Sequence, residues 1–588
     1  MLKLDYKLLR KMRLGGSRDT LGLMLLLLTV FAFHPAVVVQ NGFSLAHIKF
    51  SPALWKLAMA SLSGIGGALL ASRFVSIFDQ GKFLKSDLNI HSHSDAGDAG
   101  SNGMLLGYLV DTGQPLYTSM EEMVRHISIV GQSGVGKTIF GQLLMYQQMA
   151  KGGGIVFVDG KLDKNSLSEL YRMAAYHGRQ HDILVINPGN PSFSNTYNPI
   201  LYGDPDEVAD RIVSLIPSTE SDAGADHFKQ AAKQGCTVLI AALQKTGLAY
   251  TFIDLVILLS SPSDLTALEA RLPVCNERTN MRIFLEQYKV PDRTGNKTID
   301  IKRLKETFGG IGGRLFTFGT GRFGEIMNVT SPEVNLFEAM KSNKIIYVML
   351  PTMGKAQTAS NFGKMFLGDA RTAFSWLQEL PDDQKPNPPL LFFMDEVGSY
   401  ATETLARPFE QNRSANVILC PAYQTIANLE AVSPEFLQMV TGNTWIKAYF
   451  KAGSHESAEF ASETIGEEKQ VQATLSVSGG ESNSMNPAGV APDQNAGTSE
   501  NIGYGESLLD GYKVSPNDIK ALDMGEAIIT IGGNRVYHVR IPRIEFSQLM
   551  IDSFPEALIN KRSTPNIRGI GLFRSAQQRF KDEEEFDE

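Results

Sequence analysis

The chain has 588 residues, of which 43% are hydrophobic and 20% are charged, as in an ordinary globular protein. This composition excludes a wholly disordered, collagen-like or disulfide-scaffold protein. The formal charge of −8 is uneven, because the last eight residues, KDEEEFDE, contribute −5 of it. The rest is nearly neutral, so any contact with nucleic acid must be local. Cys236, Cys275 and Cys420 are widely spaced and match no metal-binding pattern, which fits a reducing compartment.

Two apolar stretches follow the N-terminus. Residues 21–39 contain no formal charge, and about 20 apolar residues span a bilayer as a helix. Residues 57–78 are less apolar, but small residues recur there at helical spacing, which lets membrane helices pack closely. We therefore predict two transmembrane helices within residues 20–78. A cleaved signal peptide and a buried soluble hairpin are the alternatives.

Basic residues set the expected orientation of these helices. Residues 1–19 contain six Lys and Arg against two acids, whereas residues 40–56 contain only Lys49 and Lys56. Segments rich in Lys and Arg remain on the cytoplasmic side of a membrane. We expect a cytoplasmic N-terminus, a short external loop at 40–56, and a chain that is cytoplasmic from residue 79 onward.

The next segment, residues 79–125, is polar and irregular and is expected to contain a linker and the start of the folded domain. It includes His91 and His93, for which a flexible linker is a simpler explanation than a metal site. From residue 126, short β-rich runs alternate with helical stretches, which predicts a parallel sheet covered on both faces and thus the α/β class. The expected strands are 126–130, 155–159, 183–187, 345–350, 390–395, 417–420 and 445–450.

The third and fourth expected strands are separated by a long segment whose apolar spacing is helical. We predict an all-helical insertion at 203–330 within a nucleotide-binding domain made of 126–202 and 331–545. Residues 468–510 are rich in Ser, Gly, Asn and Gln, which predicts a loop or disordered segment. A capped helix and a hairpin follow, and residues 546–588 are expected to form a polar, acidic tail.

Residues 131–138, GQSGVGKT, follow an expected strand and precede an expected helix, which is the context of a phosphate-binding loop. Glycines let the loop fold around phosphate, and its amides and the helix N-terminus attract anions. Lys137 is expected to contact the β- and γ-phosphates, and Thr138 to bind Mg²⁺. The complete set expected to bind ATP is Gly131, Gln132, Ser133, Gly134, Val135, Gly136, Lys137 and Thr138.

Two adjacent acids end the apolar run LLFFMDE of residues 390–396. Asp395 is expected to hold Mg²⁺, and Glu396 to orient or deprotonate the attacking water. A solvated strand end is the alternative, but together with residues 131–138 the pair predicts Mg²⁺-dependent ATP hydrolysis. Gln424 follows another strand, where it would sense the γ-phosphate or be a plain surface residue. Asp159 and Lys161 lie near the same edge, with a structural turn as the alternative.

The order of these features resembles the type IV secretion coupling proteins, the TraG/TraD-type ATPases that include the DotL/IcmO branch. After the two apolar stretches and the P-loop come DGKLD at 159–163, SNTYNPI at 194–200 and the helical insertion. The later matching phrases are IIYVMLP (345–351), FFMDEVGSY (392–400), ILCPAYQT (418–425), MVTGNTWIK (439–447) and SPNDIKALDMGEAII. The resemblance covers about residues 20–545.

The resemblance implies a RecA-like motor domain with Walker A and Walker B motifs, an all-alpha insertion, and a homo-hexamer at the bacterial inner membrane. It implies recruitment of DNA–relaxase complexes, effector proteins or adaptors to a type IV secretion channel, ATP and Mg²⁺ as cofactors, and contact with DNA without sequence specificity. Gln424 matches the family's polar residue after the Walker B strand. Some relatives carry a trans-acting arginine, for which this chain offers Lys447 or Arg413.

Two other functions are compatible with these motifs. A double-stranded DNA translocase of the FtsK/HerA type shares the fold, but such proteins usually end in a winged helix, and no such pattern is visible here. A non-catalytic assembly component would bind nucleotide without turnover, which the intact Lys137, Thr138, Asp395 and Glu396 argue against.

Overall fold

The computed structural model describes residues 78–79, 103–161, 164–216, 223–247, 249–291, 296–351, 356–481 and 498–545. The predicted membrane helices, about half of the predicted linker and the acidic tail lie outside these residues. Within the described part, no helix is both long and apolar enough to cross a bilayer. The chain divides into two compact units, residues 1–82 with 542–547 and the remainder. In the first unit, β1 (Phe78–Asp79) pairs antiparallel with β17 (Arg543–Ile544).

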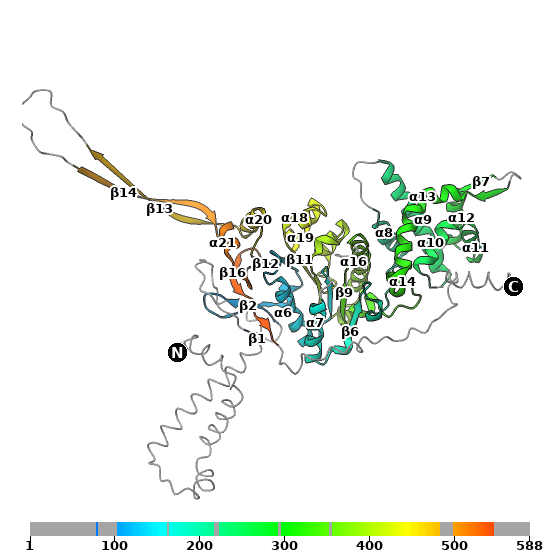
Figure 1. Cartoon of the computed structure of the whole chain (residues 1–588), viewed down its shortest axis with the longest axis horizontal. Helices are drawn as coiled ribbons and strands as arrows, with labels where there is room; N and C mark the ends of the chain where they lie inside the picture. Colours follow the sequence, from blue (N-terminus) through cyan, green and yellow to red (C-terminus); the bar gives the residue numbers. More distant parts are fainter. Residues whose placement is uncertain are drawn as a thin grey trace, which may run out of the picture. The chain divides into compact units, whose positions relative to one another are not determined.

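An eleven-stranded sheet is the centre of the second unit (Figure 1). Seven neighbouring strands, in the order β12-β4-β11-β10-β5-β9-β6, are parallel, and β15, β16, β2 and β3 extend the β12 side with antiparallel pairing. All seven predicted strands and the predicted hairpin are present, so the α/β class with a mostly parallel sheet is confirmed. The strands are β2 (Gly103–Leu109), β3 (Pro115–Ser119), β4 (Ile127–Val130), β5 (Ile155–Asp159), β6 (Ile183–Ile186), β9 (Ile345–Met349), β10 (Leu390–Met394), β11 (Val417–Tyr423), β12 (Ile446–Phe450), β15 (Glu526–Ile531) and β16 (Arg535–Arg540).

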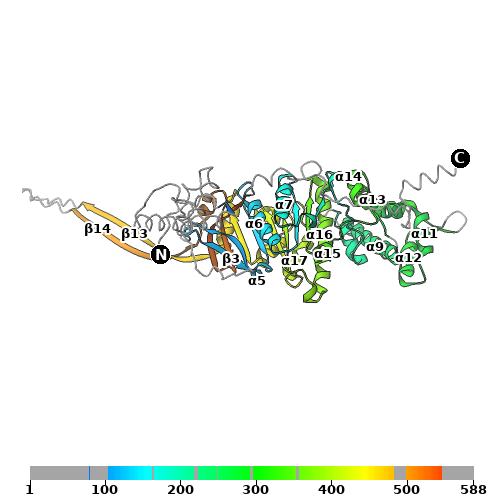
Figure 2. The same ribbon diagram turned by 90° about the horizontal axis from the view of Figure 1, so that it is seen from below.

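Helices cover both faces of the parallel part. Figures 1 and 2 show α6 and α7 on one face and α16, α17 and α19 on the other, so the LLFFM strand β10 is buried on both sides. The carboxyl ends of the parallel strands meet at one edge, where ligands bind in such sheets. The helices are α5 (Met120–Met123), α6 (Lys137–Ala150), α7 (Lys164–Tyr176), α15 (Leu336–Lys341), α16 (Ala356–Glu379), α17 (Ala406–Gln411), α18 (Ile426–Glu430), α19 (Pro434–Asn443), α20 (His455–Ile465) and α21 (Pro516–Ala521).

Seven helices separate β6 from α15 and pack around buried aromatic rings, among them Phe284 and Phe308. They are α8 (Pro205–Val213), α9 (Ala223–Lys245), α10 (Phe252–Ser260), α11 (Pro262–Arg271), α12 (Asn276–Glu286), α13 (Ile301–Gly319) and α14 (Gly321–Met327). The prediction that this segment is all-helical is wrong in one place, because β7 (Lys289–Pro291) and β8 (Lys297–Ile299) form an antiparallel pair. Three-residue strands are too short to produce a recognisable period in the sequence.

Two further predictions are wrong. Residues 468–510 were expected to lack regular structure, but β13 (Glu467–Glu481) and β14 (Thr498–Tyr512) form an antiparallel ribbon that begins between α20 and α21 (Figure 1). A ribbon needs only backbone pairing, whereas composition reports the capacity to build a core. The expectation that residues 79–125 are irregular is also wrong from residue 103, where β2 begins. A bulge between Leu105 and Gly107 interrupts the period of β2.

Candidate nucleotide-binding site

The P-loop connects β4 to α6 as the sequence predicts. Gly134 and Gly136 have φ values of +80° and +119°, which residues other than glycine rarely adopt. The Nζ of Lys137 donates hydrogen bonds to the carbonyl oxygens of Gly131 and, at 3.0 Å, of Gln132. The loop thus holds its lysine in place, while the amides at the start of α6 offer the donors that anions seek at helix N-termini.

The electrostatic environment of Lys137 favours an anion. The side chain is buried, and burial lowers the pKa of Lys137 to about 8, although the charges of Glu396 and Asp395 counteract this effect. A phosphate group beside the ammonium would stabilise its charged form. Lys137 is therefore suited to bind the phosphates of a nucleotide.

Asp395 and Glu396 lie directly after β10, at the same edge of the sheet. Asp395 is 2% exposed, and its Oδ1 accepts a hydrogen bond from the backbone nitrogen of Glu396 at 3.1 Å. Burial raises the pKa of Asp395 to about 6; the ammonium of Lys161, whose Nζ is 3.8 Å from Oδ2, opposes this rise. A cation bound beside this buried carboxylate would stabilise its charged form, so Asp395 is suited to bind one.

Glu396 is held by two side chains from neighbouring strands. Its Oε1 accepts hydrogen bonds from Gln424 Nε2 at 2.8 Å and from Lys161 Nζ at 2.8 Å. Burial would raise the pKa of Glu396, but the hydrogen bonds from Gln424 and Lys161 outweigh it, so the pKa lies below its ordinary value. The backbone of Glu396 has φ +53°, a conformation that is costly without glycine and recurs at functional sites.

The structure separates the roles of Asp159 and Lys161, which the sequence left open. Asp159 is buried and accepts hydrogen bonds from Tyr347 Oη at 2.6 Å and from the backbone nitrogen of Lys161 at 2.8 Å. Asp159 therefore shapes the turn. Lys161 reaches both acids after β10 and so belongs to the site.

Arg413 and Lys447 lie elsewhere in the same chain. Arg413 precedes β11 and Lys447 is near the start of β12, so both are at the amino edge of the parallel strands, opposite the P-loop. Lys447 donates a hydrogen bond to the carbonyl oxygen of Thr444 at 2.6 Å, and burial lowers its pKa. The side chain of Arg413 is 59% exposed and lies 3.8 Å from Glu121.

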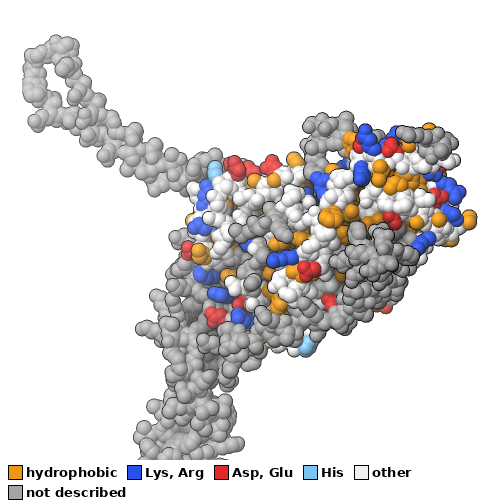
Figure 3. Space-filling model, turned by 45° about the vertical axis from the view of Figure 1, so that its right-hand side comes forward, with side chains coloured by type: hydrophobic (Ala, Val, Ile, Leu, Met, Phe, Trp, Pro, Cys, Tyr) orange, Lys and Arg blue, Asp and Glu red, His pale blue; other side chains and the backbone are white. Residues whose placement is uncertain are grey.

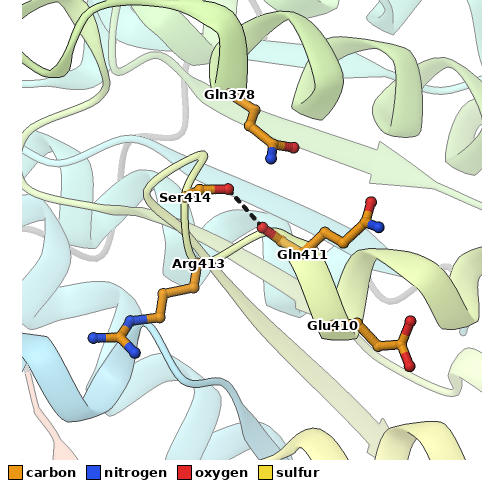
Figure 4. Close-up of a pocket in the computed structure, with 5 residues that line it drawn as sticks. All are labelled: Gln378, Glu410, Gln411, Arg413 and Ser414. Atoms are coloured by element: carbon orange, nitrogen blue, oxygen red, sulfur yellow. Dashed lines mark hydrogen bonds between the residues drawn. The ribbon is translucent and has the colours of Figure 1, made fainter.

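A cavity of about 550 Å³ lies beside Arg413 (Figure 4). It is lined by Gln378, Glu410, Gln411, Arg413 and Ser414, and the hydroxyl of Ser414 donates to the carbonyl oxygen of Gln411 at 2.8 Å. Since these residues end α16 or precede β11, the cavity belongs to the amino edge and not to the P-loop.

Two loops flank the P-loop, and no sequence motif predicted a role for either of them. The backbone nitrogen of Gln132 donates to the carbonyl oxygen of Lys451, which follows β12, at 2.9 Å. The backbone nitrogen of Gly525, which precedes β15, donates to the carbonyl oxygen of Val135 at 2.9 Å. Gly525 lies in the phrase SPNDIKALDMGEAII, and the match of this phrase to the coupling-protein pattern was the signal in the sequence.

Comparisons with known proteins agree with the family resemblance that the motifs indicate. Residues 389–510 match a family model described as the TraM recognition site of TraD and TraG. The type 4 coupling protein DotL of Legionella pneumophila is 26% identical over 403 residues, which are 60% of this chain and 51% of DotL. The chain thus spans about half the length of this curated relative.

Three solved structures are similar to the chain, each with a TM-score below 0.5. The unbound conjugative coupling protein TrwBΔN70 is 15% identical with a TM-score of 0.48, covering 73% of this chain and 88% of that one. Plasmid coupling protein TrwB in complex with ADP and Mg²⁺ has a TM-score of 0.47 at 15% identity, covering 74% and 88%. VirB4 of Thermoanaerobacter pseudethanolicus has a TM-score of 0.45 at 11% identity, covering 77% and 99%.

The order of motifs, the match to the TraG/TraD family model and the match to DotL point to one family. The chain is similar to the type IV coupling proteins in the order of its motifs and in both of these sequence matches.

Proposed function

We propose that this protein is an ATPase of the bacterial inner membrane that recruits substrates to a type IV secretion channel and energises their transfer by ATP hydrolysis. One observation carries the enzymatic part. Lys137, Asp395, Glu396 and Gln424 converge at the carboxyl edge of one sheet, in a chain related to coupling proteins. The family relationship supplies the secretion context.

The donor set fits a Mg²⁺ ion. Asp395 is buried with a raised pKa, and oxygen ligands such as its carboxylate and the hydroxyl of Thr138 are those that Mg²⁺ prefers. Mg²⁺, when bound, neutralises charge on the β- and γ-phosphate oxygens. Lys137 and the amides of the loop would hold the same phosphates.

Glu396 is the proposed general base. Its lowered pKa keeps the carboxylate ionised at neutral pH, so it can orient a water molecule and accept its proton. The water oxygen forms a bond to the γ-phosphorus while the bond from phosphorus to the β-bridging oxygen breaks, which releases ADP and phosphate. Gln424 positions the carboxylate of Glu396. Lys161 neutralises the two acids before nucleotide binds.

We propose a homo-hexamer in which a neighbour completes the site. Because Arg413 and Lys447 lie opposite the P-loop of their own chain, either one would act only across a subunit boundary. Arg413 is the better candidate, since its side chain is more exposed than that of Lys447, which is held by its own backbone. In rings that mix parent subunits with Arg413→Ala subunits, ATP hydrolysis should be slower than the rate expected from the fraction of parent subunits alone.

The helical insertion is the proposed receiving surface for cargo. Between Arg271 and Arg322 the sequence has eleven Lys and Arg against five Asp and Glu, in a chain that is acidic as a whole. Exposed apolar side chains accompany them, including Val274 and Phe316, and Figure 3 shows both kinds on this part of the surface. Such a surface suits DNA–relaxase complexes, acidic effector proteins or their adaptors.

A DNA translocase of the FtsK/HerA type remains the second candidate, because it would use the same ATP site. Affinity capture of the full-length Glu396→Gln protein from its native cells separates the two functions, since this variant should retain ATP and cargo. We expect secretion components and cargo in the captured fraction. Capture of duplex DNA without any secretion component, together with ATP hydrolysis that bare duplex DNA stimulates, would support the translocase instead.

A further inference from the structure

The order of the strands gives the P-loop two different sides. β11, β10 and β5 lie on one side of β4 and carry Gln424, Glu396 and Lys161. β12 and β15 lie on the other side. A nucleoside triphosphate has its γ-phosphate at one end and its base at the other. If hydrolysis occurs at Glu396, as proposed above, the base lies away from Glu396, and β12 and β15 form the side of β4 that faces away from Glu396.

A tight turn before β15 lies directly against the P-loop on that side. Besides the hydrogen bond from Gly525 to Val135, the two backbones approach closely at Gly136, where a Cβ atom would lie 3.3 Å from the Cα of Gly525. Gly525 has φ +80°, which favours glycine at this position. The turn is therefore part of the wall of the nucleotide site.

The buried carboxylate of Glu526 holds the turn in place. Glu526 Oε2 accepts a hydrogen bond from the backbone nitrogen of Asp523 at 3.3 Å and lies 3.3 Å from Nε2 of His538. The backbone nitrogen of Glu526 donates to the carbonyl oxygen of Asp523 at 3.1 Å. Leu522 is buried in the core at the start of the turn. The turn is thus fixed at both ends.

Met524, the residue at the tip of this turn, points its apolar surface to solvent. Its side chain is 73% exposed, whereas Leu522 and Glu526, two residues away on either side, are buried. A thioether makes favourable contacts with aromatic rings, and a flexible methionine adapts to ligands of different shape. An exposed methionine on a fixed turn at the P-loop is suited to cover an aromatic ligand group.

We propose that Met524 is a nucleobase contact of this protein and covers one face of the base of a bound nucleoside triphosphate. This inference rests on the proposed ATPase function and adds the part of the site that holds the base. Because the contact is made to the ring face and not to its hydrogen-bonding edge, adenine and guanine should benefit alike.

Equilibrium binding of ATP, GTP and inorganic tripolyphosphate to the full-length protein in detergent tests the proposal. The variants are Met524→Ala, Met524→Leu and Lys137→Ala, with Tyr117→Ala on β3 as the control for loss of an exposed apolar side chain. Met524→Ala should bind ATP and GTP about 2- to 10-fold more weakly, as expected for a contact between a thioether and an aromatic ring. It should bind tripolyphosphate as the parent does.

The remaining variants separate the proposal from its premise. Met524→Leu should keep most of the ATP affinity, and Tyr117→Ala should keep all of it. ATP affinity of Met524→Ala equal to the parent's would overturn the proposal, and so would an equal loss for ATP and tripolyphosphate, which would indicate a distorted P-loop. If Lys137→Ala bound both ligands like the parent, the proposed ATP site itself would be wrong.

Discussion

At the scale of single residues, we propose that Gln424 affects catalysis through Glu396. Its amide donates a hydrogen bond to the carboxylate at 2.8 Å. A hydrogen bond to a charged group contributes about 1.5 kcal/mol or more, so Gln424→Ala should lower kcat about tenfold. The KM for ATP should change little, because Gln424 positions the general base Glu396 and not the nucleotide.

Steady-state ATP hydrolysis by the full-length protein checks this expectation, with the exposed Gln384→Ala as a matched control. An unchanged kcat for Gln424→Ala would exclude the positioning role. An increase in KM alone would indicate that Gln424 contacts the nucleotide instead.

His126 gives the fold a defined response to acid. The residue is 2% exposed, its Nδ1 accepts a hydrogen bond from the backbone nitrogen of Leu419 at 3.2 Å, and burial lowers its pKa to about 4. Its unfolded pKa is about 6.5. The stability that the neutral ring contributes is therefore complete above pH 6.5 and is lost as the pH falls toward 4. By pH 5 the loss amounts to about 2 kcal/mol.

Denaturation midpoints at pH 7.5 and pH 5 test this coupling. His126→Asn suits the comparison, because asparagine tolerates the φ of +71° at this position. The variant should lose less stability between the two pH values than the parent protein. An identical loss in both proteins would mean that other groups cause the acid sensitivity.

Some site residues could be predicted from the sequence and others could not. Lys137, Asp395 and Glu396 follow from local motifs, whose spacing already defines their geometry. The positions of Gln424 and Lys161 depend on β11 and β5 being neighbours of β10, which no local pattern encodes. Met524 depends on the antiparallel strands next to β12, and for this reason its turn was noted only as part of a matching phrase.

At the scale of elements, a buried ion pair joins the helical insertion to the sheet domain. Arg211 on α8 lies 2.9 Å from Asp369 on α16, and both side chains are buried. Tyr197 Oη also donates to Asp369, at 2.7 Å. Asp369→Ala should destabilise the protein by about 3–5 kcal/mol, since Arg211 would remain buried without a countercharge.

Chemical denaturation followed by a probe in the insertion measures this effect. Asp210→Ala is the control, because Asp210 forms an exposed pair with Lys233 on the same insertion, and such pairs contribute about 1 kcal/mol or less. A double substitution of Arg211 and Asp369 by apolar residues should recover part of the loss. Equal effects of Asp369→Ala and Asp210→Ala would contradict the account.

Elements with strong apolar periods were predictable, and those built from pairing alone were not. β10 is apolar at every position and buried on both faces, so its sequence identifies it. The β13–β14 ribbon pairs fifteen residues on each strand in a segment with few large apolar residues. Its formation depends on which partner lies opposite, and composition does not contain that information.

At the scale of the whole molecule, the predicted membrane topology lies outside the described residues and stays a prediction. Reporter fusions at positions 47 and 110 test it, because the excess of Lys and Arg in residues 1–19 favours a cytoplasmic N-terminus. The fusion at 47 should report the periplasm and the fusion at 110 the cytoplasm. The same signal from both positions would exclude two membrane crossings.

The central claim is that Glu396 activates water for ATP hydrolysis at the carboxyl edge of the sheet. The most direct test is the hydrolysis rate of the full-length Glu396→Gln protein with bound ATP measured in the same samples. Glutamine keeps the size of the side chain but cannot accept the proton, so the rate should fall by about 100-fold or more while ATP binding is retained. Hydrolysis at the parental rate would contradict this mechanism.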